Sequence, residues 1–136
     1  MKIILLFLIP FLTFAQSDVP EKYWIDDSNF DEIISHSSAF GDDESTVVVI
    51  EFWAKFNEAN CFADWDKIQN ASYYRVDIAK APNAKKEYRI RMAPTLIIFK
   101  DGVKEVTFKA GLDLELPADL EEIQEAINEV NAASKF

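Results

Sequence analysis

The chain has 136 residues, which is enough for one domain with one hydrophobic core. Its formal net charge of −10 argues against a protein that binds nucleic acid or anionic lipid, because phosphate is recognised by lysine and arginine. One cysteine and one histidine exclude an internal disulfide and a zinc cluster of the Cys/His type. We therefore expect no metal and no cofactor. The acidity fits a basic partner or, more simply, a self-repelling soluble surface.

The chain begins like an exported protein. A basic start and an apolar run over residues 3–14 precede a small residue, Ala15. This pattern predicts a signal peptide over residues 1–15, too short to span a bilayer comfortably, and then a tether over residues 16–21. We expect secretion across the inner membrane of a bacterium, to the periplasm or the extracellular space, with no membrane insertion after cleavage. An uncleaved N-terminal anchor is the alternative.

The predicted domain spans residues 22–131, and residues 132–136 form a tail that frays. Residues 22–26 predict an edge strand at the beginning of this domain. Asp27-Ser28 then supplies the chemistry of an N-cap for a first helix, which continues to Ile34 through apolar positions at helical spacing.

A continuous apolar run over residues 46–53 predicts a strand buried within a parallel sheet. Glu51 interrupts this run, and a carboxylate there is costly unless it is paired or stays protonated. Glu51 is therefore either an acid with a tuned pKa or a residue that faces the edge of the sheet. His36 precedes this strand without a cysteine or an acid pair nearby, and we expect a solvated surface residue rather than a catalytic or metal-binding one.

Helical spacing marks the segment that follows the strand. The apolar positions i, i+1, i+4 and i+7 are Cys61, Phe62, Trp65 and Ile68. We expect a helix that Asn57 caps and that ends near residues 70–72. Cys61 would face the core on this helix, where a thiol behaves as a small hydrophobic group. A reactive monothiol and an intermolecular disulfide are the alternatives.

Turn and strand signals organise the second half of the chain. We expect a strand over 73–78, a short helix within 79–88, a strand over 95–99, a return strand over 103–109, a turn over 110–112 and a last helix over 117–130. Pro94 ends the short helix and excludes Ala93 from the α region, and Asp101-Gly102 is a strong hairpin turn. The order of elements predicts an α/β domain with a central mixed sheet.

Two segments of the chain resemble the thioredoxin family. One is Phe52-Trp53-Ala54, which follows an acid at Glu51, and the other is residues 88–102, which begin Tyr-x-Ile-Arg-x-x-Pro-Thr. The resemblance covers nearly all of the chain after the signal peptide. It implies a thioredoxin fold, in which helices flank the mixed sheet and a loop with a cis Ala93–Pro94 bond precedes a central strand. It also implies that Arg75 neighbours the buried acid, and we expect a structural ion pair between them.

The resemblance fails at the motif that defines the activity of the family. Counted without gaps, Asn57 and Asn60 occupy the positions of the two cysteines of Cys-x-x-Cys, and Cys61 follows one residue later. A dithiol reductase needs a second thiol to resolve the mixed disulfide, and the chain has none. The helix in this region is also about seven residues shorter than the family pattern, which is close to two turns.

Substrates of thioredoxin-like proteins lie across a groove made by three loops. By position, the resemblance places this groove at Phe56, Met92, Ala93, Pro94, Ala110, Gly111 and Leu112. A peptide that adds as a strand beside Ala93 needs no cysteine, although these residues could equally just close the end of the core. We expect a polypeptide-binding or assembly module without the redox dithiol. The alternative is a monothiol disulfide oxidoreductase or thiol-redox accessory that acts through Cys61.

Overall fold

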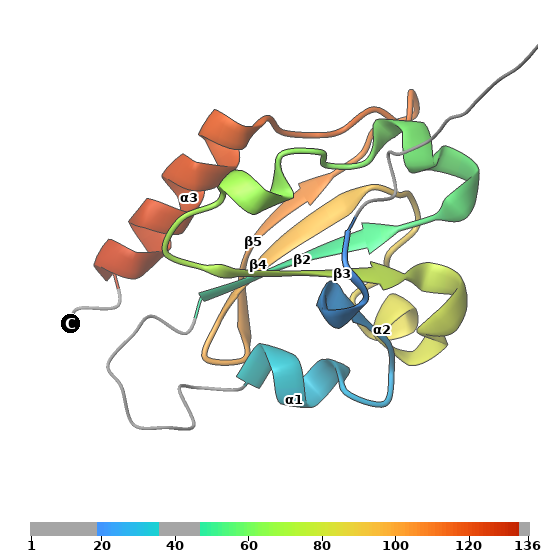
Figure 1. The fold of residues 1–136 in the computed structure, drawn as a ribbon, viewed down its shortest axis with the longest axis horizontal. Coiled ribbons are helices and arrows are strands. Elements are labelled where there is room, and N and C mark those ends of the chain that lie inside the picture. The colour runs from blue at the N-terminus through green and yellow to red at the C-terminus, as the bar shows by residue number, and fades with distance from the viewer. Residues whose placement is uncertain (1–18, 36–46, 134–136) are drawn as a thin grey trace, which may run out of the picture.

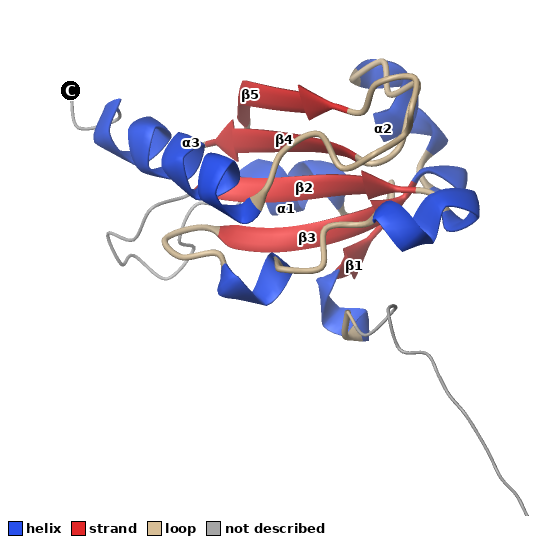
Figure 2. Cartoon of the chain, turned by 90° about the horizontal axis from the view of Figure 1, so that it is seen from above, coloured by secondary structure: helices blue, strands red, loops and turns tan. Residues whose placement is uncertain are grey.

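The computed structural model describes residues 19–35 and 47–133, and these form a mixed five-stranded sheet covered by helices (Figure 1). The strands are β1 (Trp24–Ile25), β2 (Val47–Trp53), β3 (Ser72–Asp77), β4 (Thr95–Lys100) and β5 (Val103–Lys109). Their order across the sheet is β1-β3-β2-β4-β5, as Figure 2 shows. β1 and β2 pair with β3 in parallel, whereas β4 pairs with β2 and β5 in antiparallel orientation. This arrangement confirms the predicted α/β class with a central mixed sheet.

Helices cover both faces of the sheet. They are α1 (Phe30–Ser35), α2 (Pro82–Glu87) and α3 (Leu120–Ala133). α1 and α2 lie on one face and α3 lies on the other (Figures 1 and 2). Every residue of β2 is buried, and its side chains alternate between the two cores, as the pleat of a strand requires. The continuous apolar run of this strand is therefore explained by two buried faces.

The turn signals of the sequence locate the elements well. Pro82 begins α2 at the position where a missing N–H costs nothing. Asp101 and Gly102 both have positive φ angles, 54° and 85°, which a two-residue hairpin turn between β4 and β5 requires. The predicted hairpin is confirmed.

The predicted cap Asp27 and the start of the last helix differ from the expectation. The carboxylate of Asp27 accepts from the backbone N–H groups of Asn83 and Ala84, at 2.8 and 3.0 Å, so it caps α2 rather than α1. The last helix begins at Leu120, later than the predicted Pro117. Its start is fixed by Asp119, whose side chain accepts from the N–H of the third helical residue at 2.8 Å while its own N–H donates to that residue's carboxylate at 3.0 Å.

The predicted signal peptide and His36 lie outside the described residues. Within residues 19–35 and 47–133, no helix combines the length and the apolar character needed to cross a membrane. The same residues contain no cluster of three or more His, Cys, Asp and Glu side chains that could hold a metal ion.

Candidate functional site

The two asparagines at the predicted cysteine positions tie three loops together. Asn57 lies in a 3₁₀ segment, Lys55–Asn60, directly after β2. Its side-chain Nδ2 donates to the carbonyl of Ala93 at 2.8 Å and to the carbonyl of Leu114 at 2.7 Å. Asn60 Nδ2 donates to Asn57 Oδ1 at 2.9 Å and to the same Leu114 carbonyl at 3.1 Å. We call these two residues the asparagine clamp.

The clamp corrects the expectation that Asn57 caps a helix. No side chain caps the N-terminus of the 3₁₀ segment, and Asn57 has non-helical backbone angles within it. Its amide joins positions that are 36 and 57 residues away in the chain. Carbonyl groups that would otherwise be half-buried without a donor are satisfied in this way, so the clamp contributes to stability.

The loop before β4 packs tightly against the clamp. The Ala93–Pro94 peptide bond is cis, and Thr95 Oγ1 donates to the carbonyl of Met92 at 2.7 Å. Ala93 is only 1% exposed, and its carbonyl already accepts from Asn57. A peptide that paired with this carbonyl would share it with the asparagine amide, because a carbonyl oxygen has two lone pairs.

The predicted groove residues divide sharply by exposure. Phe56 and Leu112 are 74% and 91% exposed, unusually high fractions for large apolar side chains. Gly111 is also exposed and Met92 is half-buried. The remaining three, Ala93, Pro94 and Ala110, are buried and belong to the end of the core. The exposed apolar surface of the predicted groove is therefore that of Phe56 and Leu112, which lie on loops that the clamp joins.

A buried ion pair lies on the α3 side of β2. Glu51 and Arg75 are 0% and 1% exposed, and Arg75 Nη2 lies 3.0 Å from Glu51 Oε1. The Tyr73 hydroxyl donates to the same carboxylate oxygen at 2.5 Å, and Arg75 Nε donates to that hydroxyl at 2.8 Å. Glu51 is thus paired and central, and the alternative that it faces the sheet edge is wrong.

Burial dominates the electrostatics of this pair. It raises the pKa of Glu51 above its usual range, against the attraction of Arg75 and the hydrogen bond from Tyr73. Burial works to lower the pKa of Arg75, but the negative charge of Glu51 leaves that pKa raised. Burial and the Glu51 charge together raise the pKa of Tyr73 well above its ordinary value, so the phenol stays protonated as a donor.

The ion pair also explains why the predicted helix after β2 is absent. The N–H of Phe62 donates to Glu51 Oε2 at 2.9 Å, and its carbonyl accepts from Arg75 Nη2 at 3.1 Å. Both backbone groups of Phe62 are therefore withdrawn from helical hydrogen bonding. Only two short 3₁₀ segments, Lys55–Asn60 and Trp65–Lys67, connect β2 to β3. The expectation of a helix through residues 57–68 is wrong.

Cys61 lies next to this network and is half-buried. Burial raises the pKa of its thiol; Arg75 lowers it and the Glu51 charge raises it again, with smaller effects. The thiol is therefore mostly protonated at neutral pH, which is unfavourable for a nucleophile. The expectation that Cys61 faces the core holds only in part, because the helix that would turn it fully inward is missing.

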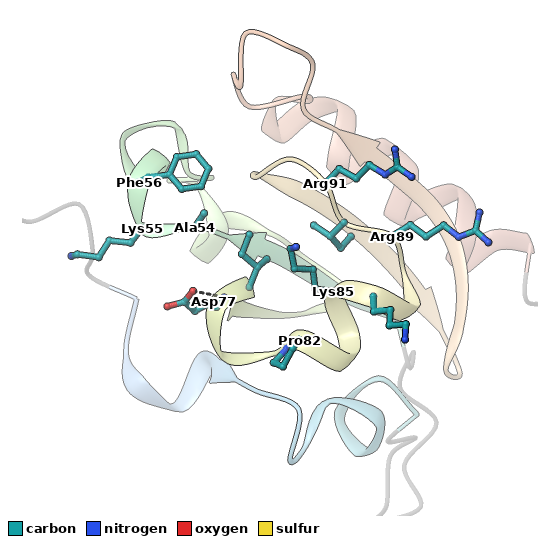
Figure 3. A pocket seen from close by; sticks show the side chains of 12 residues that line it. Ala54, Lys55, Phe56, Asp77, Pro82, Lys85, Arg89 and Arg91 are labelled. Atoms are coloured by element: carbon teal, nitrogen blue, oxygen red, sulfur yellow. Dashed lines mark hydrogen bonds between the residues drawn. The ribbon is translucent and has the colours of Figure 1, made fainter.

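A hollow beside Phe56 was not predicted from the sequence. Its volume is about 930 Å³, and its cationic lining residues are Lys55, Lys85, Lys86, Arg89 and Arg91 (Figure 3). The signal for it is four basic residues within seven positions, residues 85–91, in a chain that is otherwise strongly acidic. That cluster lies on α2 and on the loop leading to Pro94, so its side chains gather only when the fold brings α2 beside the end of β2.

Comparisons with known proteins agree with this geometry. A sequence model of the family described as Thioredoxin matches residues 21–127. The curated protein "Thioredoxin-2" of Pyricularia oryzae is 42% identical over 43 residues, which make up 31% of this chain and 25% of that protein. The matched segment thus spans about a quarter of the length of that relative.

Solved structures of thioredoxins are similar over most of the chain. A mutant thioredoxin from Halobacterium salinarum has a TM-score of 0.60 at 17% identity, covering 78% of this chain and 87% of that one. A thioredoxin from Malassezia sympodialis has a TM-score of 0.57 at 26% identity, covering 78% and 89%. One from Schistosoma mansoni has a TM-score of 0.56 at 19% identity, covering 78% and 92%. These likenesses confirm the predicted thioredoxin fold.

Proposed function

Because this chain belongs to the thioredoxin family and carries a single cysteine, we propose that it is a polypeptide-binding or assembly module without dithiol activity. One observation carries the proposal. By the sequence resemblance the asparagine clamp occupies the two positions of the family cysteines. Its amide groups hold three loops in one arrangement. An amide is not a nucleophile toward a disulfide, so Asn57 and Asn60 cannot take part in thiol exchange and instead make the loops rigid.

The loops that the clamp fixes present an apolar surface. Phe56 projects from the 3₁₀ segment that contains the clamp, and Leu112 from the loop that ends at the Leu114 carbonyl. A rigid support lowers the ordering cost of binding, since the protein side is already in its bound conformation. Phe56, Leu112 and half-buried Met92 would supply the contact area.

The proposed setting is outside the cytoplasm, in the periplasm or beyond. The support for it is the signal-peptide pattern over residues 1–15. In an oxidising compartment a thioredoxin without its dithiol can hold a partner without exchanging disulfides with it.

A monothiol redox role for Cys61 is the second candidate. It is favoured by the half-exposed position of the thiol and by the nearby Arg75 charge, which acts to lower its pKa. A catalyst of this kind would need an external thiol to resolve its mixed disulfide. The raised pKa of Cys61 argues for the binding role instead.

Selection from a displayed library of random peptides tests the proposed function. The protein is immobilised, and the library is counter-selected on a Phe56→Ser/Leu112→Ser variant, which removes the exposed apolar side chains. We expect peptides that bind the protein and the Cys61→Ala variant equally but bind the double variant poorly. Recovery of no peptides that depend on Phe56 and Leu112 would overturn the proposal, as would catalysed reduction of insulin disulfides by the protein.

A further inference from the structure

The hollow beside Phe56 has the opposite charge to the rest of the protein. The chain carries 24 acidic and 14 basic residues, yet five basic side chains and one acidic side chain, Asp77, line this hollow. None of the five forms an ion pair with a carboxylate of the described residues. An unpaired group of like charges is unfavourable in the free protein and becomes favourable when an anion is present.

The charges surround apolar surface. Phe56, Ile78 and Ile90 also line the hollow. Figure 3 shows the Lys85 side chain pointing up into the space from α2, whereas Arg89 and Arg91 extend outward along one side of it. Apolar surface framed by cations fits a ligand that has apolar side chains and carboxylates together.

The cationic surface continues toward the predicted groove. A second hollow, of about 370 Å³, shares Arg89, Ile90 and Arg91 with the first and adds Met92 and Lys109. An elongated ligand could therefore run from Phe56 past Met92 without leaving the basic surface.

We propose that these two hollows bind an acidic segment of the polypeptide partner, in which an apolar side chain packs on Phe56 and neighbouring carboxylates pair with Lys85, Lys86 and Arg89. This inference rests on the proposed function and names the chemistry of its partner. A long polyanion such as nucleic acid is disfavoured, because the net charge of −10 repels it beyond the hollows. A short peptide with acidic and apolar side chains would contact only the basic surface of the two hollows, so the local positive charge is enough to attract it.

The composition of the selected peptides separates this inference from the proposed function. We expect the selected peptides to be enriched in Asp and Glu beside Leu, Phe or Trp, although the net negative charge of the protein repels acidic peptides in general. Apolar binders without acidic enrichment would overturn the acidic-segment inference and leave the polypeptide-binding role standing. If no peptide binds, both fall together.

A charge-matched pair of variants then locates the binding. Lys85→Gln/Lys86→Gln removes two charges from the hollow, and Lys67→Gln/Lys104→Gln removes two exposed charges that do not line it. At low salt we expect the first variant to weaken binding of a synthetic selected peptide about five- to twentyfold and the control less than about twofold. Equal affinities of the two variants would overturn the inference. Melting curves of both variants check that each remains folded.

Two further measurements use the same peptide. Replacing its Asp and Glu by Asn and Gln should cost as much affinity as the lysine variant, and raising the salt from about 50 to about 500 mM should reduce the difference. Equal binding of the amide peptide would overturn the inference. Binding of a phosphatidylglycerol vesicle or a single-stranded oligonucleotide more tightly than the peptide, with the same dependence on Lys85 and Lys86, would also overturn it.

Discussion

Two polar networks include residues in or directly after β2, and they are built in opposite ways. The deeper one joins Glu51, Tyr73 and Arg75 on the buried face of the sheet, where the two charges are at most 1% exposed. The other is the asparagine clamp, which is neutral and partly buried and donates to backbone carbonyls. The deep network bonds strands to the segment at Phe62, and the clamp bonds loop to loop.

The difference shows which features of the family this chain keeps. An acid and a basic partner remain in the core, where they hold backbone that would otherwise lack hydrogen bonds. The positions that the sequence resemblance predicts for the reactive cysteines hold the amides of Asn57 and Asn60, which bind carbonyl groups and do not ionise. Structure and chemistry are therefore separable within one small region, and the two networks can be broken independently.

Arg75→Ala should have the largest effect. It leaves the Glu51 carboxylate buried without its counter-ion, and we expect a loss of about 3–5 kcal/mol in the free energy of unfolding, measured by urea denaturation. Replacing both charges, as in Glu51→Leu/Arg75→Met, should recover much of this loss, because a buried pair often contributes little beyond a well-packed apolar one. A double variant less stable than Arg75→Ala would show that the bonds to the Phe62 backbone matter more than the charges.

Asn57→Ala should have a smaller effect and a different signature. It removes three hydrogen bonds, two that Asn57 Nδ2 donates and one that Asn57 Oδ1 accepts from Asn60. The Ala93 carbonyl is left without its side-chain donor, whereas Leu114 keeps the bond from Asn60, and we expect a cost of about 1–3 kcal/mol. Hydrogen exchange should speed up in residues 92–95 and 111–116, with the sheet unchanged. Asn60→Ala is the matched control with a smaller expected loss, since Leu114 keeps its bond from Asn57. Equal exchange rates in Asn57→Ala and the unaltered protein would contradict the role of the clamp.

The sequence predicts what is local. The apolar run of β2, the hairpin turn at Asp101-Gly102 and the acid–base pair at Glu51 and Arg75 follow from neighbouring residues or from the family resemblance. The asparagine clamp could not be predicted, because its bonds cross 36 and 57 positions of the chain. The prediction of a helix through residues 57–68 failed for the same reason. Its apolar spacing is helical, but distant side chains take the backbone bonds of Phe62.

Titration of Cys61 tests whether the thiol beside the buried ion pair is protected by burial or is reactive. Its folded pKa is raised above the ordinary 9.0, mainly by burial, so the unfolded chain ionises first as the pH increases. The stability from this group is fully present below pH 9 and is lost as the pH rises through the folded pKa. The native thiol should therefore react with iodoacetamide more slowly than the denatured one and reach half-maximal rate at a higher pH. Faster native reaction would favour the monothiol role.

The smallest effect on stability is expected for Phe56→Ser/Leu112→Ser, the variant that should abolish peptide binding. Both side chains are mostly exposed, at 74% and 91%, and exposed substitutions of this kind change stability by about 0.5 kcal/mol or less. Urea denaturation of this variant beside Asn57→Ala therefore separates the two contributions of the loops. Loss of binding with unchanged stability means that the clamp supports a surface whose apolar side chains are there for a partner. A loss above about 1 kcal/mol would mean instead that those side chains close the end of the core.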